Sequence, residues 1–127
     1  MVTLTSLSED GTHIIAQVVG EQTLAMARQG FADIAELMAI TGVTKVLFDT
    51  RQQRLSMSTA DAYEVAQMAT QPAFRDAIFA VVAPGNLALP HFIETVATNR
   101  GVRGRYFNDE AQALAWLQVA PDSQQQA

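Results

Sequence analysis

The chain has 127 residues, of which 49% are apolar and 17% are charged, a composition typical of one folded domain rather than of a disordered chain. It contains no cysteine, which excludes disulfides, thiolate metal sites and a cysteine nucleophile. Eight Lys and Arg residues against thirteen Asp and Glu residues give a net charge of −5, so nucleic-acid phosphates and anionic lipid surfaces repel the chain unless its few cations cluster.

The first elements are predicted to be two strands and a long helix. Apolar residues alternate over residues 2–7, and Asp10-Gly11 favours a hairpin turn before a return strand over residues 13–19. Apolar residues three and four apart then predict a helix over residues 21–40. Gly42 follows this helix and is the residue type that most often provides a left-handed cap.

Strands and helices alternate in the rest of the chain. Residues 43–48 are a compact, largely apolar and β-branched run, and residues 77–83 are a continuous apolar run, the pattern of strands covered on both faces. The other elements expected are a polar loop at 50–55, a helix at 59–71, a helix from Pro90 to Gly101, a strand at 102–107 and a helix that begins at 108–110.

The element order ββαβαβαβα predicts a single α/β domain whose five-stranded mixed sheet is flanked by about four helices. The two apolar strands, over residues 43–48 and 77–83, should be adjacent and central. The strand over residues 102–107 should lie near an edge, because it carries Arg103 and Arg105 on one face. We assign residues 1–118 to the domain and residues 119–127 to a flexible, glutamine-rich tail.

Residues typical of catalysis are sparse in this sequence. His13 and His91 have no second histidine or carboxylate at metal-ligand spacing, and no nucleophile elbow, Walker loop or dinucleotide fingerprint is present. We therefore expect no enzyme activity, no metal and no cofactor. A hydrolase that uses Asp49 or His91 is kept as an alternative.

Ser58 is the most informative single residue. With Asp61 three residues later, it fits a capping box in which its hydroxyl accepts from the amides that begin the second helix. The alternative is a phosphoacceptor, because a phosphate at a helix N-terminus is stabilised by the helix dipole and can pair with Arg51 or Arg54. Both interpretations stay open.

The element order, the apolar strand that ends at Asp49, and Ser58 nine residues later resemble the STAS fold of bacterial anti-sigma-factor antagonists, the SpoIIAA-like proteins. The C-terminal part, with Tyr106-Phe107 and the Ala113-x-x-Trp116-Leu117 helix, is similar to small bacterial STAS/SEC14-like proteins.

The resemblance implies a non-enzymatic regulatory or protein-interaction module. In it, Ser58 matches the phosphoacceptor position and Asp49 matches the aspartate that ends the preceding strand. Met57 stands where the antagonists have an aspartate and Ala60 where they have a glycine, so the sequence departs from the phosphorylation segment at both positions.

The kinship with SEC14-like lipid carriers implies an alternative function, the carriage or sensing of a small apolar ligand. Methionine adapts to irregular ligands, so the candidate pocket residues are Met26, Met57, Tyr63 and Met68. The same methionines at helical spacing equally fit an ordinary core.

Positive charge is concentrated at Arg100, Arg103 and Arg105, which are candidates for binding an anion or for a solvated strand face. We expect a cytoplasmic protein without nucleic-acid binding or membrane insertion, because its longest apolar run, residues 77–83, is far shorter than the roughly 20 residues that span a bilayer. The expected partner is a protein bound through residues 51–63, and open sheet edges also permit a homodimer.

Overall fold

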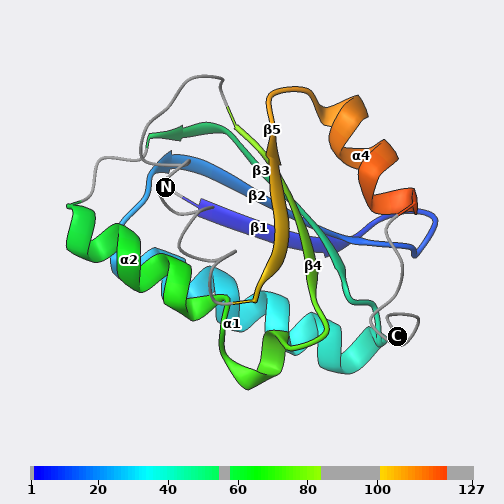
Figure 1. Ribbon diagram of the computed structural model, residues 1–127, viewed down its shortest axis with the longest axis horizontal. Helices are drawn as coiled ribbons and strands as arrows, with labels where there is room; N and C mark the ends of the chain where they lie inside the picture. Colours follow the sequence, from blue (N-terminus) through cyan, green and yellow to red (C-terminus); the bar gives the residue numbers. More distant parts are fainter. Residues whose placement is uncertain (1, 55–57, 84–100, 120–127) are drawn as a thin grey trace.

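Five strands form one sheet in the order β1-β2-β3-β4-β5 in the computed structural model, which describes residues 2–54, 58–83 and 101–119 (Figure 1). The strands are β1 (Val2–Leu7), β2 (Ile14–Glu21), β3 (Lys45–Arg54), β4 (Ile78–Val82) and β5 (Arg103–Phe107); the helices are α1 (Leu24–Thr41), α2 (Thr59–Met68) and α4 (Glu110–Val119), with a 3-10 turn, η1, at Pro72–Phe74.

The sheet is mixed, as the element order predicts. β1 is antiparallel to β2, and each later pair of neighbours is parallel. β3 and β4 are adjacent and interior, which confirms the prediction made from their apolar segments, and β5 forms an edge. The fold is therefore the expected α/β domain with a five-stranded sheet. The described residues contain three α-helices, and the fourth expected helix, beginning at Pro90, falls outside them.

Both ends of α1 are capped by the residue types that its sequence provides. The Thr23 hydroxyl accepts from the Met26 amide at 3.3 Å. At the other end, Gly42 has a φ of 75° and its amide donates to the Met38 carbonyl at 2.8 Å, which confirms the left-handed cap. These two caps set the length of the helix that covers β1 and β2.

The start of α1 and the end of β2 each differ by a few residues from the prediction, since β2 continues to Glu21 and α1 begins at Leu24. Two further boundaries are wrong. The expected loop at residues 50–55 is mostly strand, because β3 continues to Arg54 and pairs with the end of β2 through Gly20↔Gln53 and Glu21↔Arg54. Pairing with β2 provides hydrogen bonds for the backbone of this segment. The Arg51 and Gln52 side chains are exposed, so a polar sequence is compatible with a strand here. The second helix ends at Met68 rather than at residue 71, and Pro72 begins η1 instead.

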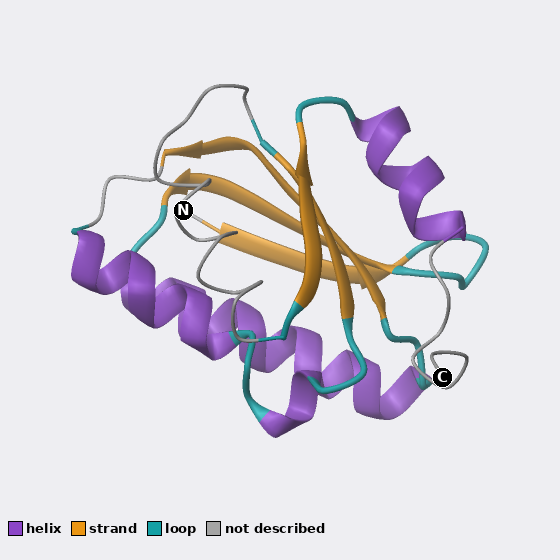
Figure 2. Cartoon of the chain, viewed as in Figure 1, coloured by secondary structure: helices purple, strands orange, loops and turns teal. Residues whose placement is uncertain are grey.

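The helices cover the sheet on two sides (Figures 1 and 2). α1 and α2 lie on one face, where Ile34 of α1 packs with sheet residues such as Ile14, Val46 and Phe79. Phe31 lies at the centre of this core, with ring centroids 5.4 Å from Phe74 and 5.7 Å from Phe48.

α4 lies on the opposite face and contacts β3, β4 and β5. Its buried Ala113 and Leu117 pack against Leu47 and three apolar residues of β4, which are Ile78, Ala80 and Val82. β4 is thus covered on both faces, which explains its uninterrupted apolar sequence.

Candidate functional site

Ser58 lies at the N-terminus of α2 and caps it. Its backbone is extended, with φ −65° and ψ 162°, and its hydroxyl accepts from the Asp61 amide at 3.1 Å. The Ser58 carbonyl accepts the first helical bond, from Ala62 at 2.9 Å. The predicted cap is confirmed, and because the residue is exposed, its hydroxyl is open to solvent while it caps the helix.

Arg51 links two carboxylates on the α4 face of the sheet. Its guanidinium donates to both oxygens of Asp49, at 3.0 and 2.8 Å, and to Glu110 at the start of α4 at 2.6 Å. Asp49 is the most enclosed of the three, with 14% of its side chain exposed against 44% for Arg51 and 46% for Glu110. The arrangement ties β3 to the first turn of α4.

The Arg51 pairing also sets the ionisation of its partners. The hydrogen bond from the Arg51 side chain holds the pKa of Asp49 below its ordinary value of 3.8, although partial burial works in the other direction. The same contact raises the pKa of Arg51, with a smaller contribution from Glu110. Asp49 and Arg51 are therefore both charged at neutral pH.

This ion pair changes the expected role of Arg51. The sequence predicts Arg51 or Arg54 as a partner for a phosphate on Ser58, but the structure directs the Arg51 guanidinium to Asp49 and Glu110. The Arg54 side chain and Met57 lie outside the described residues. Asp49 and Arg51 are two apart on one strand and so share a face, which is the sequence signal for their contact; nothing local in the sequence indicates Glu110.

The described pocket candidates belong to the α1 and α2 layer. Met68 is buried with 6% exposed, and Met26 and Tyr63 are half-buried. Two hollows lined by described residues lie on the other face of the sheet, and none of these three side chains lines either of them. Core packing explains Met68 without a ligand.

The basic strand face is partly occupied by contacts within the protein. Arg103 donates through Nη2 to the Asp76 carbonyl at 3.2 Å, and the Arg105 guanidinium lies 5.5 Å from the ring centre of Phe107. Arg100 lies outside the described residues. An anion site at these arginines stays a prediction.

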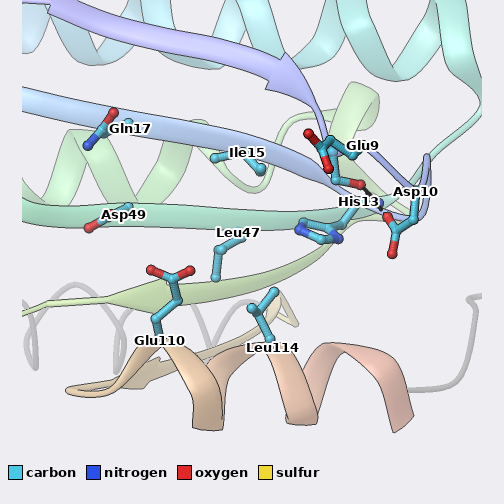
Figure 3. Close-up of a pocket in the computed structure, with 10 residues that line it drawn as sticks. Glu9, Asp10, His13, Ile15, Gln17, Leu47, Asp49, Glu110 and Leu114 are labelled. Carbon is cyan, nitrogen blue, oxygen red and sulfur yellow. Dashed lines mark hydrogen bonds between the residues drawn. The ribbon is translucent and has the colours of Figure 1, made fainter.

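A groove that the sequence did not indicate runs between α4 and the β1–β2 hairpin (Figure 3). Its volume is about 460 Å³, and a smaller hollow of about 160 Å³ adjoins it and shares Asp10, His13 and Leu114. The groove is lined by Ser8, Glu9, Asp10, His13, Ile15, Gln17, Leu47, Asp49, Glu110 and Leu114. The available signal was the alternation in β2, which places Ile15 and Gln17 on the face opposite the buried Ile14 and Ala16.

Hydrogen bonds order the β1–β2 loop at one end of this groove. Asp10 accepts from the Ser8 hydroxyl at 2.7 Å, from the Thr12 hydroxyl at 2.8 Å and from the Thr12 amide at 3.1 Å. These bonds, that from Ser8 first, lower the pKa of Asp10 from 3.8 to about 2. Gly11 follows with a φ of 72°, the conformation that its residue type permits.

Two further features concern the described residues alone. None of their helices combines the length and the apolarity that crossing a membrane requires. Their His, Asp and Glu side chains form no group of three or more placed to hold a metal ion.

No protein-family model matches the sequence, and no curated protein matches it at a significant level. Solved structures do match. An uncharacterised protein of the DUF3478 family with a SpoIIAA-like fold, from Shewanella loihica, is 21% identical over 91% of this chain and 92% of its own, with a TM-score of 0.57.

Two anti-sigma-factor antagonists also match. SpoIIAA in its unphosphorylated form is 9% identical over 94% of this chain and 100% of its own, with a TM-score of 0.60. An anti-sigma-factor antagonist from Mycobacterium paratuberculosis is 16% identical over 92% of this chain and 93% of its own, with a TM-score of 0.61. At these identities the likeness shows the fold: the chain has the SpoIIAA-like fold that its sequence resembles.

Proposed function

We propose that the protein is a cytoplasmic, non-enzymatic regulatory module that binds a partner protein through the rim where α2 begins. The observation that carries this proposal is Ser58, exposed at the N-terminus of α2 in a fold shared with anti-sigma-factor antagonists. An exposed hydroxyl at a helix N-terminus is a favourable place for a phosphate, because the first-turn amides and the helix dipole stabilise negative charge.

Phosphorylation of Ser58 would act on this rim in two ways. It would add nearly two negative charges beside Asp61, which lies in the first turn of α2, and it would replace the neutral cap by a charged one. The Arg51 guanidinium is held by Asp49 and Glu110, so the added charge would remain available to the partner surface. The proposed regulation is therefore a change in partner affinity rather than a rearrangement of the fold.

Affinity capture from the native cells tests the proposal. Tagged wild-type protein, Ser58→Ala and Ser58→Asp should be compared by quantitative mass spectrometry, together with phosphopeptide mapping of residue 58. We expect one partner whose recovery changes strongly with Ser58→Asp, because aspartate keeps the cap and adds the charge. Identical partners for all forms, with Ser58 unmodified, would contradict the phosphorylation switch.

Thr23→Ala is the matched control. Thr23 caps α1 as Ser58 caps α2, so both alanine variants lose an N-cap worth about 1 kcal/mol. A partner lost equally in both variants reports instability rather than a binding surface. The absence of catalysis is tested separately by an esterase and phosphatase screen, in which an activity abolished by Asp49→Asn would contradict the non-enzymatic proposal.

A further inference from the structure

The sheet face that carries α4 is only partly covered by the described residues. α4 contacts β3, β4 and β5, whereas Leu4 of β1 stays 56% exposed and Ile15 of β2 is half-buried. The strand register pairs Leu4 with Gln17 and Ile15 with Leu47, which places these residues on the same face beside α4. The uncovered strip thus runs along β1 and β2.

The strip has the width of one helix. Neighbouring strands are about 4.8 Å apart, so two strands present roughly the 10 Å that a helix with its side chains occupies. On the opposite face, α1 packs on these same two strands, β1 and β2, and α2 contacts α1 (Figure 1). On the α4 face, no second helix among the described residues covers β1 and β2, which leaves the room that such a helix would fill.

The groove described above lies in this strip and has an apolar floor with acidic ends. Ile15 and Leu47 form the floor, and Leu114 of α4 projects toward them from the wall (Figure 3). Glu9 and Asp10 lie at the hairpin end, and Asp49 and Glu110 lie toward the start of α4. Burying the floor requires an apolar ligand surface, and the ends favour cations on either side of it.

The cations nearby offset only part of this acidic charge. Arg51 is shared between Asp49 and Glu110, and Lys45 lines the adjoining hollow together with His13. Four carboxylates thus face one guanidinium and one ammonium group. A second copy of the chain, with its net charge of −5, is poorly matched to such a rim, as are nucleic acids and anionic lipids.

We propose that this groove docks a basic amphipathic helix of a partner protein, parallel to α4 on the strip of β1 and β2. The apolar stripe of that helix packs on Ile15, Leu47 and Leu114, and Lys or Arg residues flanking the stripe reach Glu9 and Glu110. This surface is separate from the rim of α2, because α2 lies on the other face of the sheet. The two sites can therefore be occupied together.

The test uses the full chain and a designed probe, a fluorescein-labelled 18-residue peptide with leucines at i, i+3, i+4 and i+7 and lysines flanking that stripe. A peptide of the same composition with the stripe scrambled is the control ligand. Fluorescence anisotropy measures binding, and amide chemical-shift mapping locates it. We expect the largest shifts in β2, β3 and α4, and weaker binding of the scrambled peptide.

Matched variants distinguish peptide binding at the groove from a general attraction to the acidic protein. Glu9→Gln with Glu110→Gln removes two charges at the groove, and Glu36→Gln with Glu64→Gln removes two exposed charges on α1 and α2. We expect the groove pair to weaken binding about fivefold or more, and the distant pair to change it far less. Ile15→Thr should also weaken binding while Ser58→Ala leaves it unchanged, with thermal unfolding showing that each variant is folded.

Three results would overturn the proposal. If both double variants weakened peptide binding equally, the peptide would be responding to the net charge of the protein rather than to the groove. Chemical-shift changes confined to α1 and α2 would place the peptide on the face of the sheet opposite the groove. Sedimentation that shows self-association blocked by Ile15→Thr would assign the groove to a second copy of the chain instead.

Discussion

Arg51 and Glu110, 59 residues apart in the sequence, meet at 2.6 Å and fasten the beginning of α4 to β3. Glu110 lies in the first turn of α4, where a carboxylate is also favoured by the positive end of the helix dipole. The contact thus holds the wall of the groove against its floor.

Arg51→Ala removes both ion pairs, and we expect it to lower the free energy of unfolding by about 1 kcal/mol or less, because Arg51 and Glu110 are well exposed. Urea unfolding measures this change. Arg28→Ala, on the exposed side of α1, is the control, and raising the salt concentration should narrow the difference from wild type. An effect of several kcal/mol would show that more than a surface ion pair depends on Arg51.

The lowered pKa of Asp10 predicts that the folded protein becomes less stable in acid. Folding lowers its pKa from 3.8 to about 2, so the unfolded chain binds this proton more readily than the folded protein does. The stabilisation is complete above about pH 4 and is lost as pH falls toward 2. Asp49, whose pKa is also lowered, acts in the same direction.

Unfolding of wild type and Asp10→Asn at pH 5, 3 and 2 checks this prediction. We expect wild type to be the more stable at pH 5 and the difference to shrink toward pH 2, because asparagine does not titrate. NMR titration of the Asp10 carboxyl group provides a direct measurement. A midpoint near 3.8 would mean that the bonds from Ser8 and Thr12 do not persist in solution.

Burial predicts opposite outcomes for one substitution at two positions of α1. Ile34 is 0% exposed within the aromatic core, whereas Ile40 is 72% exposed. Ile34→Ala should cost about 2–5 kcal/mol through lost burial and a cavity. Ile40→Ala should change the unfolding free energy by about 0.5 kcal/mol or less. Calorimetry or urea unfolding distinguishes the two, and similar costs would contradict the placement of α1 on the sheet.

The sequence predicted the fold wherever a local pattern carried the information. The apolar runs of β3 and β4 require cover on both faces, which places them at the centre of the sheet. Gly42 and Ser58 were predictable for the same reason, since a cap depends on residues within one turn of its helix.

Contacts between distant segments were not predictable in the same way. The polar composition of residues 50–54 predicted a loop, but these residues form a strand because they pair with the end of β2. The groove likewise depends on where α4 crosses the sheet, which no periodicity within α4 specifies. Glu110 was identified as a helix-start residue, but its contact with Arg51 required the packed structure.

Ser58 permits a stability prediction that is independent of any partner. Ser58→Ala leaves the Asp61 amide without its acceptor at the start of α2, so we expect a loss of about 1 kcal/mol. Ser58→Asp should retain most of the stability, because aspartate also caps and its charge suits the helix dipole. Equal losses in urea unfolding for the two variants would show that the cap contributes little.

Substitutions of Gly42, at the end of α1, test the cost of backbone strain without steric crowding. Its φ of 75° is left-handed, yet a Cβ atom built there meets nothing within 4 Å, so only the backbone conformation opposes a side chain. Gly42→Ala should therefore lower the unfolding free energy by about 1–2 kcal/mol. Gly42→Asn should cost less, because asparagine tolerates this conformation better than alanine does. Thermal or urea unfolding ranks the three proteins, and alanine that is as stable as glycine would mean that α1 ends differently in solution.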